Sequence, residues 1–226
     1  MIIGGFQKNS MIDYPGKIGS VVFTGGCNFH CPYCHNPSLV DGSYGELHES
    51  EIFNFLRKRV GLIEGVVLTG GEPTLHRDLP FLCSRIKNMG FSIKLDTNGS
   101  KPEIIKKMIN SKCVDYFAMD IKTAPENYHT LTNEPDMAEK IISSVNLIIK
   151  SGIDYEFRIT CAKTFIDKKN IKGILKVLEG SKRVYLQKLV RKKMLDEDYI
   201  KNEEDPDLEN LKSIIEPYVL DCSIRS

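Results

Sequence analysis

The stretch "GVVLTG", residues 65–70, is short and almost wholly apolar, and it ends in glycine. Such a run predicts a strand that is buried on both faces, which is typical of parallel sheets. Five further runs have the same character, and we expect them to be strands as well: residues 19–24, 91–97, 115–121, 155–161 and 183–189. The chain therefore favours a sheet built largely from buried strands.

Longer segments, with apolar residues at helical spacing, alternate with these strands. Several begin near Ser, Asp or Pro and end at Gly, as helices often do. The predicted helices are residues 49–61, 77–90, 101–112, 135–152, 167–180 and 206–219. Six strand–helix units in 226 residues match the size of right-handed βα repeats, in a sheet that is either barrel-like or open and doubly wound.

No linker of low complexity divides the chain, so we expect one domain over residues 1–226, with its core at about 18–190 and a C-terminal helix and tail at 207–226. The last residues, "LDCSIRS" at 220–226, are expected to be loosely held. The 31 basic and 30 acidic side chains create no overall field, so neither nucleic acid nor a membrane is an expected partner. The absence of a signal-like start and of a long apolar stretch predicts a soluble cytoplasmic protein.

Conspicuous polar or glycine-rich sequence follows every predicted strand. Parallel βα sheets gather their chemistry at the carboxyl ends of the strands, because the loops there converge. These features therefore predict one composite active site along a single rim, which holds "GGCNFHCPYCHNP" (25–37), "GGEPT" (70–74), Asp96 to Gly99, Asp120 to Lys122, Arg158 with Thr160, and Gln187 with Lys188.

Three of the seven cysteines, Cys27, Cys31 and Cys34, crowd into eight residues. Clustered thiols in a chain of this size favour metal or redox chemistry in a reducing compartment over a disulfide scaffold. The other four are scattered, and we expect them to be ordinary buried side chains: Cys83, Cys113, Cys161 and Cys222.

The cysteine cluster has three interpretations. "CPYC" resembles a glutaredoxin dithiol, but a glutaredoxin requires Cys31 at the start of a helix, and "HNP" (35–37) is a poor helix start. This interpretation also gives Cys27 no role. Zinc would take the three thiols with His30 or His35. A 4Fe-4S cluster on three thiolates would leave one iron open to a substrate or cofactor.

The sequence "CNFHCPYC" (27–34) matches the CxxxCxxC signature of radical S-adenosylmethionine (SAM) enzymes, and "GGEP" (70–73) resembles their second hallmark. More narrowly, the chain resembles activating enzymes of glycyl-radical enzymes, in particular the branch of anaerobic ribonucleoside-triphosphate reductase activating proteins. This resemblance covers residues 1 to about 190 and rests on "IDYPGK" (12–17), "FTGGCNFHCPYCHNP" (23–37), "TGGEPTL" (69–75), "LDTNG" (95–99) and "MDIK" (119–122). It implies an α/β fold, a partial (βα)6 TIM-like barrel with a parallel sheet and outer helices.

The resemblance also implies the chemistry. A 4Fe-4S cluster on Cys27, Cys31 and Cys34 would bind SAM at its open iron and cleave it reductively to methionine and a 5'-deoxyadenosyl radical. The radical would then form a glycyl radical on a partner enzyme, the protein substrate. A low-potential donor of the flavodoxin or ferredoxin type would supply the electron.

Individual SAM contacts follow from the same resemblance. Gly70, Gly71 and Glu72 are expected at the methionine amino group, Tyr33 on adenine, and His35 beside the cluster. Gln187 stands nearest to where several activases carry a histidine, so that adenosine contact is in doubt. The ribose and carboxylate contacts are expected from Asp96, Asn98, Lys122 and Arg158, and a monovalent cation is weakly implied at Asp96, Thr97 and Asp120.

Two alternatives remain open for the function. One is a radical SAM enzyme that acts on a small molecule in cofactor biosynthesis. The other is a non-catalytic zinc-binding protein. The remaining histidines have no companions at catalytic spacing and are expected to be surface or hydrogen-bonded polar residues: His30, His48, His76 and His129.

Overall fold

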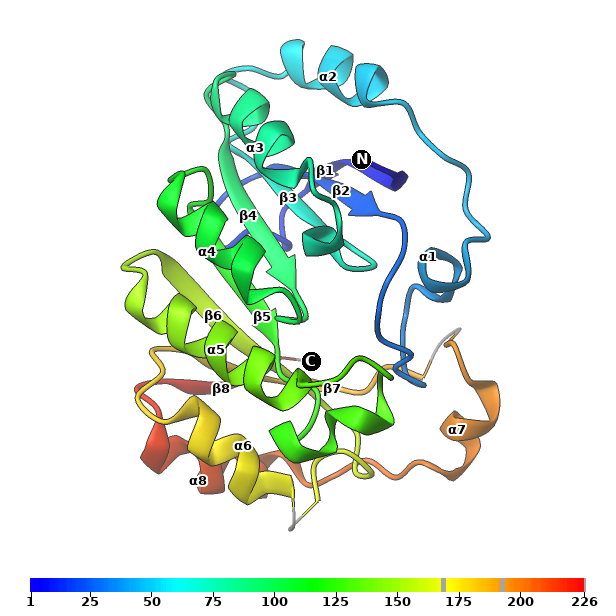
Figure 1. Cartoon of the computed structure of the whole chain (residues 1–226), viewed down its shortest axis with the longest axis vertical. Helices are drawn as coiled ribbons and strands as arrows, with labels where there is room; N and C mark the ends of the chain where they lie inside the picture. The colour runs from blue at the N-terminus through cyan, green and yellow to red at the C-terminus, as the bar shows by residue number, and fades with distance from the viewer. Residues whose placement is uncertain (168–169, 192–193, 226) are drawn as a thin grey trace.

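The structure is a computed structural model that describes residues 1–167, 170–191 and 194–225. Within these residues eight strands form one sheet in the order of the chain, and every neighbouring pair is parallel except β1 and β2. Figure 1 shows the sheet curving around an interior. The strands are β1 (Ile3–Ser10), β2 (Gly19–Thr24), β3 (Gly65–Gly70), β4 (Ser92–Thr97), β5 (Tyr116–Asp120), β6 (Asp154–Cys161), β7 (Val184–Lys188) and β8 (Cys222–Arg225).

The helices alternate with the strands along the chain, and α3 to α6 lie side by side along one side of the sheet (Figure 1). The predicted α/β partial barrel, with its parallel sheet and outer helices, is confirmed. Residues 168–169 of the helix predicted at 167–180 lie outside the described residues. The helices are α1 (Pro37–Asp41), α2 (Glu49–Arg57), α3 (Leu79–Lys87), α4 (Pro102–Asn110), α5 (Met137–Lys150), α6 (Asn170–Leu178), α7 (Glu197–Asn202) and α8 (Leu208–Ile215), with short 3-10 turns at Pro73–Leu75, Pro125–Thr130 and Glu216–Tyr218.

The helices α2 to α6 and α8 each bury an apolar face. In α3, for example, Leu79, Leu82, Cys83 and Ile86 recur at the spacing of one helical face, and all four are buried. Burying one such Leu or Ile side chain stabilises the fold by roughly 1.5–3 kcal/mol. This packing fixes the loops that leave the carboxyl ends of the strands.

The amino-terminal end of the barrel interior is filled by side chains. Tyr14, from the loop between β1 and β2, packs into a buried cluster with Val21, Val67, Tyr116 and Ala118. Its ring centroid lies 6.1 Å from that of Tyr116. Because this end is packed, room for a ligand remains toward the carboxyl ends of the strands.

Two predictions about local structure were wrong. The C-terminal tail is ordered: Cys222–Arg225 forms β8 against β7, and Arg225 forms a bidentate ion pair with Glu156 inside the barrel. The segment after Cys34 does begin a helix, since α1 starts at Pro37, and proline is favoured at the first helical position.

The strand β1 escaped prediction because "IGGFQKNS" carries two glycines and a polar run, so it lacks an apolar pattern. None of the helices in the described ranges is both long and apolar enough to cross a membrane.

Candidate active site at the carboxyl ends of the strands

One cavity of about 410 Å3 opens at the carboxyl ends of the strands, and all the predicted cluster, SAM and cation contacts line it. Lys188, which was predicted at the same rim, lines a separate pocket instead. Strand β2 delivers the cysteine loop, β3 the Gly70–Glu72 turn, and β4 to β7 the remaining polar side chains. The predicted residues that line it are Cys27, Cys31, Tyr33, Cys34, His35, Gly70, Gly71, Glu72, Asp96, Thr97, Asn98, Asp120, Lys122, Arg158 and Gln187. The rim is therefore one site, as the loops of a parallel sheet lead us to expect.

Backbone hydrogen bonds hold the cysteine loop in place. Gly26 N donates to Leu39 O at 2.7 Å, and His30 N donates to Leu131 O at 2.8 Å. Cys31 is buried, whereas Cys27 and Cys34 are half-buried. The loop thus presents three thiols to the cavity from an irregular segment.

Burial raises the pKa of Cys27 to about 12 and that of Cys31 to about 11, so these two thiols are protonated at neutral pH. The ammonium of Lys122 opposes this shift at Cys31. Across the described residues, no three His, Cys, Asp or Glu side chains already converge as metal ligands do. Three thiols in one loop are nevertheless the donor set that an iron–sulfur cluster takes, and its binding would release their protons.

The Gly70–Glu72 turn packs against the cysteine loop at a distance only glycine permits. Gly70 has φ 116°, a conformation that disfavours side chains, and a Cβ on Gly71 would lie 1.9 Å from Gly26 O. The two glycines therefore let the turn approach the backbone that leads into Cys27.

Glu72 is 1% exposed, and its carboxylate is largely occupied by protein donors. Oε1 accepts hydrogen bonds from Thr74 N at 3.0 Å, Thr74 Oγ1 at 2.6 Å and Thr97 Oγ1 at 2.7 Å, while Oε2 accepts one from Asn98 N at 2.6 Å. Burial raises the pKa of Glu72, against the effect of these donors. Glu72 thus ties the β3 turn to the β4 turn, and only Oε2 retains a lone pair for a ligand.

Five charged side chains form a chain of ion pairs, and all of them except Lys94 line the cavity. Arg158 Nη1 lies 3.0 Å from Asp96 Oδ2, and Arg158 Nε lies 2.7 Å from Asp120 Oδ1. Lys94 pairs with the other oxygen of Asp96, and Lys122 Nζ lies 3.0 Å from Asp120 Oδ2. Two of these cations, Arg158 and Lys122, line the cavity itself, where they can meet an anionic group of a ligand.

The same ion pairs involve two of the three residues at which a monovalent cation was implied, Asp96 and Asp120. Burial alone would raise the pKa of Asp96 and Asp120, but Arg158 and the two lysines outweigh it and hold both pKa values below the ordinary range. Thr97 Oγ1 donates to Glu72. Since both carboxylates already face protein cations, the cation site remains a prediction that this arrangement does not favour.

Tyr33 is 2% exposed and packs against Phe165 and Tyr199, at centroid distances of 5.4 and 6.4 Å. Among the described atoms its buried hydroxyl has no hydrogen-bond partner. Such a group is costly unless a ligand or water satisfies it. Tyr33 also lines the cavity, so a ligand bound there would lie beside this residue.

The cavity also bears on two other interpretations of the cysteine cluster, namely a zinc site with His30 or His35 and a glutaredoxin dithiol. His35 lines it at an exposed position, whereas His30 does not line it. Cys31 is not at a helix start, because α1 begins at Pro37, so the glutaredoxin geometry is absent from this loop. The four scattered cysteines are buried away from the cavity, as expected.

Asp13 is a site residue that the sequence analysis did not assign. It lines the cavity from the loop between β1 and β2, and its carboxylate accepts a hydrogen bond from Ser10 Oγ. Asp13 lies in the stretch "IDYPGK", which the sequence analysis singled out. Its position at the cavity depends on strand β1, which was not predicted.

The fold is a partial α/β barrel, and its cavity gathers three thiols with acidic and basic side chains at the carboxyl ends of the strands, as an enzyme active site does. The profile of the Radical SAM superfamily matches residues 21–172, and the chain belongs to this superfamily. The superfamily uses a 4Fe-4S cluster and SAM, so these are the cofactors of this protein, and the cavity residues fit both.

Over its whole length the chain is 32% identical to a Methanocaldococcus jannaschii protein whose name assigns it, provisionally, to the glycyl-radical enzyme activating enzymes, and it covers 96% of that protein. It is also 37% identical to the 7-carboxy-7-deazaguanine synthase of Aquifex aeolicus, over 33% of each chain.

The structure of Streptococcus suis SuiB bound to the precursor peptide SuiA superposes with a TM-score of 0.67 and 16% identity. That match covers 91% of this chain but only 48% of SuiB, so it shows the fold alone.

Proposed function

We propose that this protein is an activating enzyme of a glycyl-radical enzyme, with an anaerobic ribonucleotide reductase-like protein as its partner. The observation that carries the proposal is the union of three thiols, the Gly70–Glu72 turn and the Arg158 charge chain in one cavity. The full-length similarity to an activating enzyme supports the choice within the superfamily.

The side chains divide the work of binding the cofactors. Cys27, Cys31 and Cys34 would hold the cluster, and three protein ligands would leave one of its four irons for SAM. When bound, the reduced cluster supplies the electron that cleaves SAM into methionine and a 5'-deoxyadenosyl radical. The radical takes a hydrogen atom from a glycine Cα of the partner, so one C–H bond breaks, another forms on the 5' carbon, and 5'-deoxyadenosine is released.

Charge complementarity orients the methionine part of SAM. Arg158 and Lys122, which both line the cavity, present their positive charges to its carboxylate. The Gly70–Gly71 backbone approaches its amino group, and Glu72 Oε2 offers one remaining acceptor position. Tyr33 lies against adenine, while Asn98 and Gln187 offer amide groups to the ribose and adenosine.

A small-molecule substrate is the second candidate. The partial similarity to 7-carboxy-7-deazaguanine synthase favours it, and a cavity of about 410 Å3 is of a size that holds small ligands. That similarity is confined to 33% of this chain, whereas the similarity to the activating enzyme spans all of it.

Deuterium transfer distinguishes the two candidates. The reconstituted protein is incubated anoxically with SAM, a low-potential ferredoxin or flavodoxin, and a glycyl-radical enzyme of the same organism produced with α-deuterated glycine. The proposal predicts that 5'-deoxyadenosine gains one deuterium. If it remains unlabelled, and its release is instead stimulated by a pterin-like or purine substrate, the second candidate replaces the first.

A further inference from the structure

Asn28 follows the first cluster cysteine and joins the cysteine loop to two other loops. Its Oδ1 accepts hydrogen bonds from Asn98 Nδ2 at 3.0 Å and from Ser100 Oγ at 3.3 Å. Its Nδ2 donates to Glu134 Oε1 at 3.0 Å. The half-buried side chain thus has protein partners at both ends of its amide.

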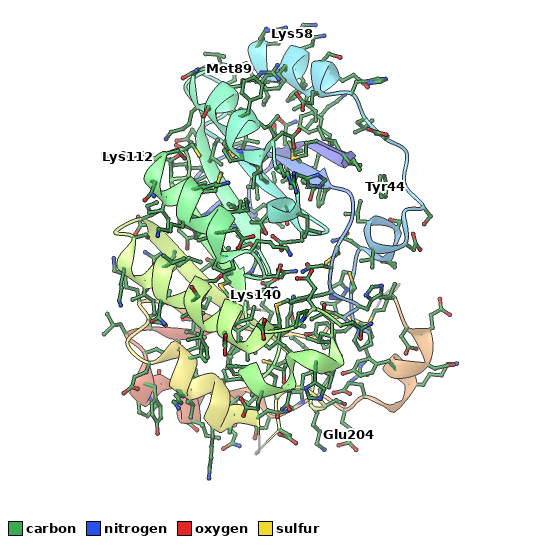
Figure 2. All side chains as sticks on the ribbon, viewed as in Figure 1. Tyr44, Lys58, Met89, Lys112, Lys140 and Glu204 are labelled. Carbon is green, nitrogen blue, oxygen red and sulfur yellow. The ribbon has the colours of Figure 1, made fainter. Side chains whose placement is uncertain are left out.

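Glu134 in turn anchors this contact to two outer helices. Lys101, just before α4, places Nζ 3.0 Å from Glu134 Oε2, and Lys140 on α5 places Nζ 3.3 Å from the same oxygen. Lys140 is labelled in Figure 2, where it projects from the start of α5. The carboxylate is therefore a fixed acceptor, held by elements packed against the sheet.

The hydrogen bonds of Asn28 Oδ1 connect it to Asn98, one of the predicted SAM contacts. Asn98 also accepts a hydrogen bond from Ser100 N at 2.9 Å, and its own backbone N donates to Glu72. A displacement of Asn28 would therefore reach both the cysteine loop and the turn that carries Asn98.

We propose that Asn28, held by Glu134, is a positioning residue that sets the cysteine loop at a fixed distance from the Asn98 turn and so aligns the cluster with SAM. The inference rests on the proposed function only in that this loop holds the cluster and Asn98 contacts SAM. The loop lacks helix or strand between Cys27 and Cys34, and the side-chain contacts of Asn28 add to the few backbone hydrogen bonds that hold it.

A pair of substitutions tests this contact. Asn28→Asp keeps the acceptor for Asn98 but sets a carboxylate against Glu134, and the like charges repel. Glu134→Gln added to Asn28→Asp restores a donor–acceptor pair, because the amide Nε2 of the glutamine can donate to the new carboxylate. Glu49→Gln is the matched control, since it removes a carboxylate from another ion pair, with Arg85, outside the cavity.

Two readouts are measured. In the metal-free protein, amide hydrogen exchange of residues 27–34 should become faster in Asn28→Asp and return to the wild-type rate in the double variant. In the reconstituted protein, the KM for SAM in partner-free cleavage should rise about tenfold in Asn28→Asp, which corresponds to the loss of about 1.4 kcal/mol, and should recover in the double variant. Glu49→Gln should match wild type in both.

Unchanged exchange and an unchanged KM in Asn28→Asp would overturn the proposal, and so would a double variant no better than the single one. Neither readout requires a glycyl-radical partner. If SAM is cleaved but no partner glycine is attacked, the proposed function fails while this inference stands.

Discussion

Arg158 and Asp120 stand opposite each other in the register of β6 and β5, and their side chains meet in the cavity with Nε 2.7 Å from Oδ1. Arg158 also reaches Asp96 on β4, so one guanidinium spans three neighbouring strands. Its position is thus fixed by the sheet itself.

We expect Arg158→Gln to raise the KM for SAM at least tenfold, because the amide keeps polar contact with the aspartates but removes the charge that pairs the SAM carboxylate. Asp96 and Asp120 keep Lys94 and Lys122, so the protein should still fold. Partner-free 5'-deoxyadenosine release measures the KM, and Arg158→Lys should show a smaller rise. A KM for Arg158→Gln equal to that of wild type would exclude Arg158 from SAM binding.

Replacing Glu72 by glutamine should destabilise the metal-free protein by about 2 kcal/mol, since hydrogen bonds to a charged acceptor are lost and an amide N–H2 would face the donors of Thr74 or Asn98. Urea unfolding measures the loss. Glu103→Gln, at an exposed position of α4, should change stability by less than about 0.5 kcal/mol. Equal effects in the two variants would show that Glu72 does not join the turns.

The C-terminal strand should depend on the ion pair of Arg225 with Glu156. Both guanidinium nitrogens lie 2.9 Å from the carboxylate, and Glu156 is 1% exposed. We expect Arg225→Ala to lower the free energy of unfolding by about 2 kcal/mol, because it leaves a buried charge with only the hydroxyl of Tyr116 and more distant cations.

Adding Glu156→Gln to Arg225→Ala should restore part of this stability, since the neutral amide costs less to bury. Urea unfolding of the four proteins forms a double-mutant cycle. Strictly additive effects would mean that the two side chains do not stabilise each other.

His76 gives the stability a pH dependence. Its Nε2 lies 3.0 Å from Gly25 O, and burial lowers its pKa from the ordinary 6.5 despite that contact. The unfolded chain therefore takes up the proton more readily, and stability falls as the pH drops below 6.5. Between about pH 7.5 and about pH 5.5, wild-type protein should lose more stability in urea unfolding than His76→Gln, which does not titrate. Identical losses would contradict this.

The parallel strands and their rim were predictable because each buried strand carries a local apolar pattern, and because parallel topology brings their carboxyl ends together. Strand β8 was not predictable, because its four residues place only Cys222 and Ile224 on the outer face, which is too short an apolar pattern to recognise. The residue that pairs with Arg225 of this strand, Glu156, is 69 positions away in the sequence. The same holds for Asp13, and for the link between Asn28 and Glu134, 106 positions apart, which only the folded chain brings together.

The proposed function requires this radical SAM protein to generate a radical on a glycine of a partner protein. Electron paramagnetic resonance of a glycyl-radical enzyme from the same organism, after anoxic incubation with the reconstituted protein, SAM and a low-potential reductant, tests it most directly. We expect a glycyl radical signal that forms together with 5'-deoxyadenosine and is absent when Cys34→Ala replaces the wild-type protein. Release of 5'-deoxyadenosine without any radical on the partner would contradict it.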